Sequence, residues 1–258
     1  MNRMKKIVAA LLTLTTIFVS GFANVQQPKI TIAVAANMQY AFNELKSEFA
    51  KSNNIEIDVV VGSSGNLTHQ IMHGAPFDIF VSADTAYAAK IFKNNFAAEP
   101  PKVYAQGVLV LWTTKPNLKP EATLRFLLSN KIKRIALANP IIAPYGTAAE
   151  AILKKYNLMG RLAGKLVYGE SITQTSQFIA TQNADAGFTA KAIVLSNQMK
   201  NKGIWIELNL NDYAPILQSA VLLKYGMKKN AAAAKTFYEF LYSARAKEIY
   251  KKYGYIVK

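Results

Sequence analysis

Residues 30–37 read ITIAVAAN, which is an apolar run typical of a buried strand followed by a small-residue turn that ends in asparagine. Beyond this turn, Phe42, Leu45 and Phe49 recur with the spacing of one helix face. A strand that leads through a short turn into a helix is the unit from which α/β sheets are built. The stretch therefore predicts an α/β fold.

The same alternation continues along the chain. Further strands are expected at 55–61, 77–81, 108–112, 135–138, 166–167, 186–188 and 221–223, and further helices at 67–73, 85–93, 147–156 and 174–181. Two helices rich in alanine, phenylalanine and tyrosine close the chain. Strands that alternate with helices predict mainly parallel sheets, and about 235 residues beyond a leader suit one large domain or two lobes.

Four loops of small residues fall where an expected strand gives way to a helix, at 35–37, 62–65, 143–146 and 170–173. Ligands of parallel α/β sheets lie beyond the carboxyl ends of the strands, so these loops are the expected binding loops. A helix N-terminus offers unpaired N–H groups and a partial positive charge. Several such ends around one cleft predict an anion site that needs no lysine or arginine.

Asn37 and Ser64 are the best polar candidates in these loops. Each can present a backbone N–H and a side-chain donor to the same anion. The alternative is that both side chains are ordinary N-caps, since asparagine and serine are common at that position. The sequence leaves both interpretations open.

Enzymatic interpretations are weaker. His69 and His73 have the spacing of a zinc-protease pair, but Gln70 stands where that pattern requires an acid, so a polar helix face is expected instead. A hydrolase that uses Ser64 is also disfavoured, because the glycines of residues 62–65 are one residue too close for a Gly-x-Ser-x-Gly elbow.

The first 23 residues have the layout of a signal peptide. Basic residues at 1–6 precede an apolar run from Ile7 to about Val19, and small residues stand at Gly21 and Ala23. We expect cleavage after Ala23; the alternative is an uncleaved membrane anchor. The chain has no cysteine, which excludes disulfides, thiolate metal sites and a lipid-modified cysteine. These features predict a soluble periplasmic protein.

The formal charge is +16, and loss of the three basic leader residues lowers it to +13. The lysines are scattered, and the densest groups lie at helical spacing beside apolar residues. They predict solvated helix faces rather than a nucleic-acid surface. The charge would raise the local concentration of an anionic ligand.

Residues 74–84, GAPFDIFVSAD, are the most distinctive run. Together with the loops at 35–37, 63–64 and 144–146 and the ending at 237–255, this run resembles the periplasmic molybdate-binding proteins of bacterial ABC importers. The resemblance implies the two-lobed type II periplasmic binding protein fold with an oxyanion between the lobes. Lobe 1 would comprise 28–106 and 219–258, and lobe 2 would comprise 107–218.

The resemblance also implies a set of ligand contacts. These are the side chain and N–H of Asn37, the side chain and N–H of Ser64, and the N–H groups of Tyr145 and Ile172. Ala190 stands where many relatives place a tyrosine whose hydroxyl binds the anion. The Tyr145 hydroxyl could replace this missing donor, either on the anion or across the cleft; alternatively the ring only packs at the rim.

The function implied by the resemblance is capture of molybdate, and of tungstate too, for delivery to a permease in the inner membrane. Such a protein is a monomer that catalyses nothing and needs no cofactor, no metal cation and no nucleic acid. The alternatives are a binding protein for another tetrahedral oxyanion such as sulfate, or an exported serine hydrolase.

Overall fold

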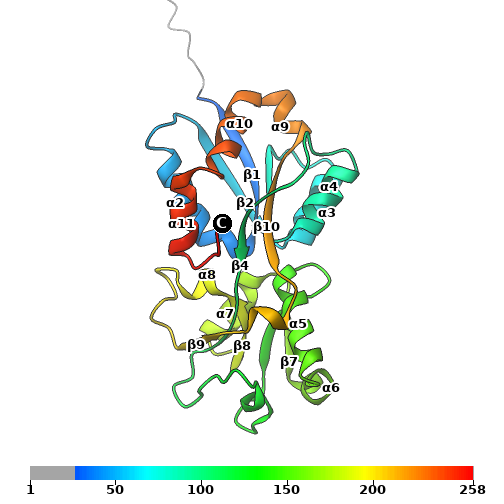
Figure 1. The fold of residues 1–258 in the computed structure, drawn as a ribbon, viewed down its shortest axis with the longest axis vertical. Helices are drawn as coiled ribbons and strands as arrows, with labels where there is room; N and C mark the ends of the chain where they lie inside the picture. The colour runs from blue at the N-terminus through cyan, green and yellow to red at the C-terminus, as the bar shows by residue number, and fades with distance from the viewer. Residues whose placement is uncertain (1–26, 258) are drawn as a thin grey trace, which may run out of the picture.

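The computed structural model describes residues 27–257, so the expected signal peptide at 1–23 lies outside the described residues. The chain forms two lobes, one above the other in Figure 1, and each is built around a five-stranded sheet. None of the helices between residues 27 and 257 has the length and apolar character needed to cross a membrane.

The first sheet forms the centre of the upper lobe. In spatial order its strands are β2 (Glu56–Gly62), β1 (Lys29–Ala35), β3 (Ile79–Ser82), β10 (Ile216–Leu222) and β4 (Lys102–Gly107). β1 pairs in parallel with β2 and β3, whereas β10 runs antiparallel to β3 and β4. Figure 1 shows α2 and α11 on one side of this sheet and α3 and α4 on the other.

The helices of this lobe are α2 (Gln39–Phe49), α3 (Ser64–Met72), α4 (Thr85–Lys93), α9 (Lys224–Lys229), α10 (Ala231–Phe240) and α11 (Ala244–Lys252), with a 3₁₀ turn η1 (Ala36–Met38) before α2. The core between the sheet and α2, α10 and α11 is rich in aromatic rings. The Phe237 ring lies 5.6 Å from that of Phe42 and 4.9 Å from that of Phe49, measured between centroids. These rings join the C-terminal helices to the N-terminal α2.

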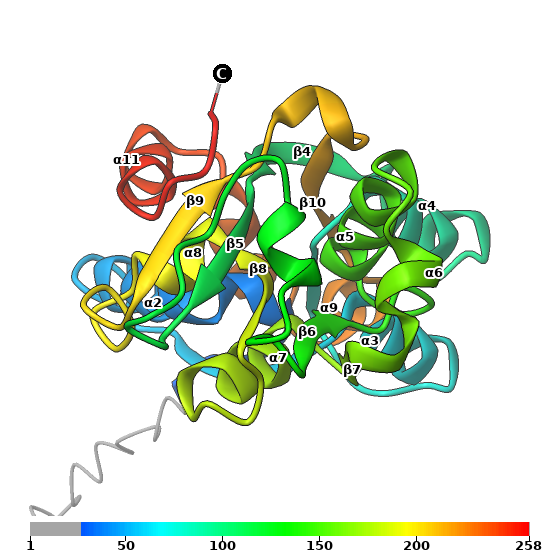
Figure 2. The same cartoon turned by 90° about the horizontal axis from the view of Figure 1, so that it is seen from below.

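The second sheet has the same plan. Its strands are β7 (Leu166–Gly169), β6 (Ile135–Ala138), β8 (Ala186–Ala190), β5 (Leu109–Thr113) and β9 (Ile204–Glu207), and here β5 is the strand that runs antiparallel to its neighbours. The helices are α5 (Pro144–Lys155), α6 (Met159–Leu162), α7 (Ile172–Ala180) and α8 (Lys191–Val194), with 3₁₀ turns at Arg125–Leu128, Ala163–Lys165 and Leu210–Asp212. Seen from below in Figure 2, α5 and α6 lie on one side of the sheet and α7 lies on the other, where it packs against β6 and β8.

The predicted α/β class with two mainly parallel sheets is confirmed. The chain passes between lobes twice, from β4 through Val108 to β5 and back from β9 to β10. The first residues of β10 pair with β4, Ile216 opposite Gly107, so residues 216–218 continue the first sheet. The lobe boundary expected at residue 219 stays a prediction.

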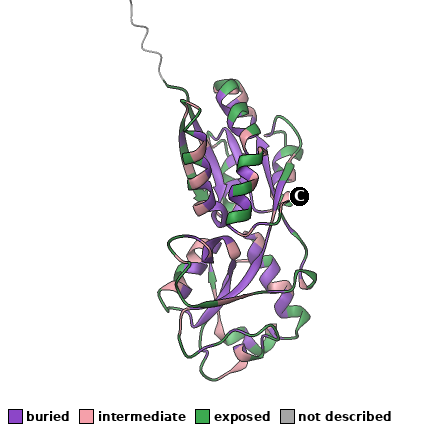
Figure 3. Ribbon diagram, turned by 60° about the vertical axis from the view of Figure 1, so that its left-hand side comes forward, coloured by how far each residue is buried: buried purple, intermediate pink, exposed green. Residues whose placement is uncertain are grey.

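Two strands were not expected from the sequence, β4 and β9, and both lie at sheet edges. β4 reads KVYAQG and has no continuous apolar run, and β9 reads IWIE and has only three apolar residues, so neither has the length of apolar run that predicts a strand. Figure 3 shows the contrast, with buried central strands beneath helices whose outer faces are exposed.

Three helices also begin earlier than the sequence suggested. α3 starts at Ser64, α5 at Pro144 and α7 at Ile172. The first turn of a helix needs no apolar residue, so periodicity cannot mark its start. As a result, the later residues of three of the four loops, 64–65, 144–146 and 172–173, lie inside the first helical turn.

Candidate functional site

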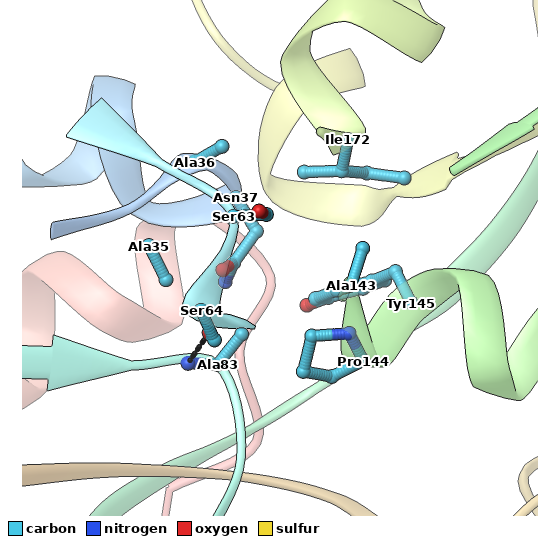
Figure 4. A pocket seen from close by; sticks show the side chains of 10 residues that line it. All are labelled: Ala35, Ala36, Asn37, Ser63, Ser64, Ala83, Ala143, Pro144, Tyr145 and Ile172. Carbon is cyan, nitrogen blue, oxygen red and sulfur yellow. Dashed lines mark hydrogen bonds between the residues drawn. The ribbon is translucent and has the colours of Figure 1, made fainter. Parts of the chain in front are cut away.

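The four predicted site residues, Asn37, Ser64, Tyr145 and Ile172, line one cavity between the lobes. The other lining residues are Ala35, Ala36, Ser63, Ala83, Ala143 and Pro144. Figure 4 shows lobe 1 residues on one side of this cavity and Ala143, Pro144, Tyr145 and Ile172 on the other. Its volume of about 10 Å³ is close to what one water molecule needs, so the lobes are closed on each other.

Helix starts supply backbone donors around the cavity. Ser64 is the first residue of α3, Ile172 the first of α7 and Tyr145 the second of α5. N–H groups in the first turn of a helix have no acceptor within it. Such groups, with the positive end of each helix dipole, are ready donors for an anion.

The capping alternative for Ser64 and Asn37 does not describe this structure. The caps of α3 and α7 are the preceding residues: Ser63 Oγ accepts the Asn66 N–H at 3.4 Å and Ser171 Oγ accepts the Gln174 N–H at 3.2 Å. Asn37 lies within η1, and neither η1 nor α2 has a side-chain cap.

The Ser64 hydroxyl is oriented by a neighbouring loop. Its Oγ accepts the Ala83 N–H at 3.0 Å, and the side chain is buried. A hydroxyl has one proton to donate and two lone pairs. With a lone pair occupied by Ala83, the proton remains for a ligand in the cavity.

The Asn37 side chain lies differently from what was expected. Its Nδ2 donates to Gln218 Oε1 at 2.7 Å and to the Tyr255 hydroxyl at 2.9 Å, so both amide protons have partners within lobe 1. Its Oδ1 is buried and has no hydrogen-bond partner among the described residues. The group that Asn37 offers to an anion in this arrangement is its backbone N–H; donation from its side chain stays a prediction.

Tyr145 places a buried hydroxyl between the lobes. The residue is only 2% exposed, and its hydroxyl makes no hydrogen bond of standard geometry with the described residues, although the Asn37 side chain lies close to it. Burial raises the pKa of Tyr145 well above its ordinary value, so the hydroxyl keeps its proton. A buried hydroxyl that makes no hydrogen bond of standard geometry is uncommon and is a candidate donor to a ligand or water.

Gly107 makes room for this hydroxyl at the crossover between lobes. A Cβ at Gly107 would lie 2.0 Å from the Tyr145 hydroxyl oxygen and 2.9 Å from Gln218 Nε2. The ring of Tyr145 in lobe 2 therefore reaches the end of β4, the last strand of lobe 1 before the chain first crosses to lobe 2. Ala190 is fully buried in the same apolar cluster as Tyr145 and does not line the cavity.

No histidine, carboxylate, lysine or arginine lines the cavity. The rings of His69 and His73 stack at 4.0 Å between centroids and line a different hollow, with Met72 and Tyr87. Ser64 thus has no general base beside it in the cavity. Over residues 27–257, no group of three or more potential metal ligands comes together.

Direct contacts hold the lobes together around the cavity. The Gly65 N–H donates to the Ile142 carbonyl at 2.9 Å, and the Tyr87 hydroxyl donates to the Ile141 carbonyl at 2.7 Å. On another side, Thr173 Oγ1 donates to the Ala36 carbonyl at 3.1 Å. These bonds link α3, α4 and η1 of lobe 1 to the loop before α5 and to the first turn of α7.

This geometry agrees with comparisons to known proteins. A family model described as bacterial extracellular solute-binding protein matches residues 30–256. The chain belongs to this family. It is 36% identical over 231 residues to the molybdate-binding protein of Azotobacter vinelandii, which covers 89% of this chain and 90% of the relative. The molybdate-binding protein of Rhodobacter capsulatus is also 36% identical, covering 89% of each chain.

Solved structures of other proteins share the fold. The periplasmic molybdate-binding protein of Azotobacter vinelandii superposes with a TM-score of 0.83 at 32% identity, covering 89% of this chain and 99% of that one. A sulfate-binding protein from Mycobacterium tuberculosis superposes with a TM-score of 0.74 at 12% identity, covering 88% and 86%. The second likeness shows the fold alone.

Two residues that shape the site were not identified from the sequence, Gln218 and Tyr255. Both are buried and both contact Asn37. Gln218 carried a usable signal, since it is a polar residue inside the otherwise largely apolar strand ILQSAVL. A buried amide in a strand needs several hydrogen-bond partners, and most of them must come from other segments of the chain.

Proposed function

We propose that this protein is a periplasmic solute-binding protein that captures molybdate, and also tungstate, and delivers it to the permease of an ABC importer in the inner membrane. It acts as a monomer and catalyses no reaction. The observation that carries the proposal is a closed cavity lined by helix starts from both lobes and by no charged side chain. The names of the relatives support molybdate as the ligand.

An oxyanion suits this chemistry better than a cation or a neutral molecule. The Ser64 and Tyr145 hydroxyls and the N–H groups of Ser64, Tyr145 and Ile172 are donors, and donors to a charged group contribute about 1.5–3 kcal/mol each. A buried dianion is costly unless its oxygens find donors on all sides. Because the closed lobes leave room for about one water, ligand entry requires the lobes to part.

We expect the mature protein to bind molybdate and tungstate at least about 100-fold more tightly than sulfate or phosphate, a difference of roughly 2.7 kcal/mol. Hydrogen phosphate carries a proton that needs a strong acceptor, and no carboxylate lines the cavity. Sulfate is smaller than molybdate and would meet fewer donors in a cleft closed on the larger ion. Calorimetric titration with the sodium salts of the four oxyanions measures the order of their affinities. Sulfate or phosphate binding as tightly as molybdate would contradict the assignment of molybdate as the ligand.

Tyr145→Phe tests whether the Tyr145 hydroxyl, like that of Ser64, donates to the bound oxyanion. The substitution keeps the ring and the N–H, and we expect roughly tenfold weaker oxyanion binding, as for loss of one hydrogen bond to a charged group. The unfolding free energy of the ligand-free protein should change little, because the hydroxyl makes no hydrogen bond of standard geometry with the described residues. Tyr213→Phe is the matched control, since its buried hydroxyl accepts the Leu109 N–H at 3.0 Å outside the cavity lining. An affinity of Tyr145→Phe within twofold of wild type would show that the hydroxyl does not bind the anion.

A further inference from the structure

Gln218 is a fully buried amide at the strand that returns to lobe 1. The β4–β10 register shifts between Gln218 and Ser219, and this irregularity puts both side chains in the interior. Bulges of this kind redirect side chains next to functional sites. Gln218 Nε2 donates to the carbonyls of Ala83 at 2.9 Å and Ile216 at 3.0 Å, and Oε1 accepts from Asn37 Nδ2 at 2.7 Å.

These bonds reach two of the four predicted site residues. Gln218 contacts Asn37 directly, and it holds the carbonyl of Ala83, whose N–H binds Ser64 Oγ. Ser219 Oγ donates to the next carbonyl, that of Asp84, at 2.7 Å. The start of β10 therefore fixes both the Asn37 turn and the loop that orients the Ser64 hydroxyl.

Tyr255 brings the C-terminal tail into the same network. The tail turns at Gly254, whose φ of +76° favours glycine, and Ile256 then exchanges two backbone hydrogen bonds with Gln106, of 2.8 and 2.9 Å. This places the Tyr255 hydroxyl against Asn37, where it donates to the Asn37 carbonyl at 3.0 Å and accepts from Nδ2 at 2.9 Å. Tyr255 thus holds both the backbone and the side chain of Asn37.

The orientation of the Asn37 amide follows from these partners. Gln218 must turn its NH₂ group toward the two carbonyls, because an amide oxygen there would face two acceptors. Its oxygen then faces Asn37 and requires the Asn37 NH₂ group. Asn37 cannot turn its amide protons into the cavity without leaving Gln218 Oε1 unpaired in the interior, which is costly.

We propose that Gln218 and Tyr255 are positioning residues of the anion site: they hold Asn37 so that its backbone N–H, and not its side-chain amide, is presented to the oxyanion. The inference rests on the proposed function and extends it to the C-terminal tail. Removal of outer hydrogen-bond partners of ligand residues typically costs about 10- to 100-fold in affinity.

Tyr255→Phe is the direct test, and Tyr250→Phe is its matched control. Tyr250 is equally buried in the same region, and its hydroxyl donates to the Leu241 carbonyl at 2.8 Å without touching Asn37. Each variant removes a buried hydroxyl, so both should lower the urea midpoint of unfolding to a similar degree. We expect Tyr255→Phe to bind the preferred oxyanion roughly tenfold more weakly than wild type and Tyr250→Phe to stay within twofold. Equal affinity losses in both variants, or no loss in Tyr255→Phe, would overturn the inference.

A second measurement separates this inference from the proposed function. In ligand-free, ¹⁵N-labelled protein, hydrogen exchange of the Asn37 side-chain NH₂ should be faster in Tyr255→Phe and in Gln218→Met than in wild type, and unchanged in Tyr250→Phe. Unchanged exchange in Tyr255→Phe and Gln218→Met would overturn the positioning role whatever the ligand. Failure of the wild type to bind any of the four oxyanions would instead overturn the proposed function, and the exchange result would still decide the positioning role.

Discussion

Gly65→Val is expected to weaken oxyanion binding by at least about 100-fold while the protein stays folded. Gly65 is the second residue of α3 in lobe 1, and a Cβ there would lie 2.9 Å from both Cα and Cβ of Ile142 in lobe 2. A valine therefore keeps the lobes apart and breaks the bond from the Gly65 N–H to the Ile142 carbonyl. A ligand bound to an open lobe 1 loses the Tyr145 and Ile172 donors, at about 1.5–3 kcal/mol each.

The structure offers a clean control for this prediction. Gly160 lies exposed on α6, and a Cβ there meets nothing within 4 Å. Both variants exchange a glycine for a better helix former, so Gly160→Val should not lower the unfolding free energy and Gly65→Val should lose only the interlobe contact, about 1 kcal/mol. Calorimetry gives the affinity, and small-angle scattering shows whether molybdate still compacts the protein. Wild-type affinity in Gly65→Val would mean that lobe closure does not contribute to binding.

Ser64→Ala should weaken binding by roughly 10- to 100-fold, because it removes one hydroxyl donor to a buried dianion. The backbone N–H at the start of α3 remains, so binding should weaken and not vanish. Ligand-free stability should fall by about 1 kcal/mol, the typical worth of the bond that Ser64 Oγ accepts from the Ala83 N–H.

Ser243→Ala is the matched control for Ser64→Ala. Ser243 Oγ accepts the Ala246 N–H at 3.1 Å at the start of α11, outside the cavity lining. The two variants should lose similar stability, as judged by urea unfolding, and only Ser64→Ala should lose affinity. If Ser64→Ala and Ser243→Ala bound the oxyanion with equal affinity, the Ser64 hydroxyl would not be a ligand contact. The helix N-termini would then be the main donors.

The sequence pattern by itself determined the alternation of strands and helices, the α/β class and the loops that line the cavity, whereas the division into two lobes was implied by the family resemblance. These features have local causes. An apolar run such as residues 30–34 and a periodic face such as Phe42, Leu45 and Phe49 each report on burial within one element. The carboxyl ends of parallel strands meet at one edge, so loops after such strands converge whatever their order along the chain.

Only the tertiary structure decided which polar groups remain for a ligand. The amide of Asn37 was a candidate donor in the sequence, but its protons bind Gln218 and Tyr255, which lie 181 and 218 residues away. The Tyr145 hydroxyl of lobe 2 lies against Gly107, where it makes no hydrogen bond of standard geometry with the described residues. Whether a side-chain donor is already hydrogen-bonded depends on the residues that pack against it. These residues come from distant segments of the chain, which a local sequence pattern cannot identify.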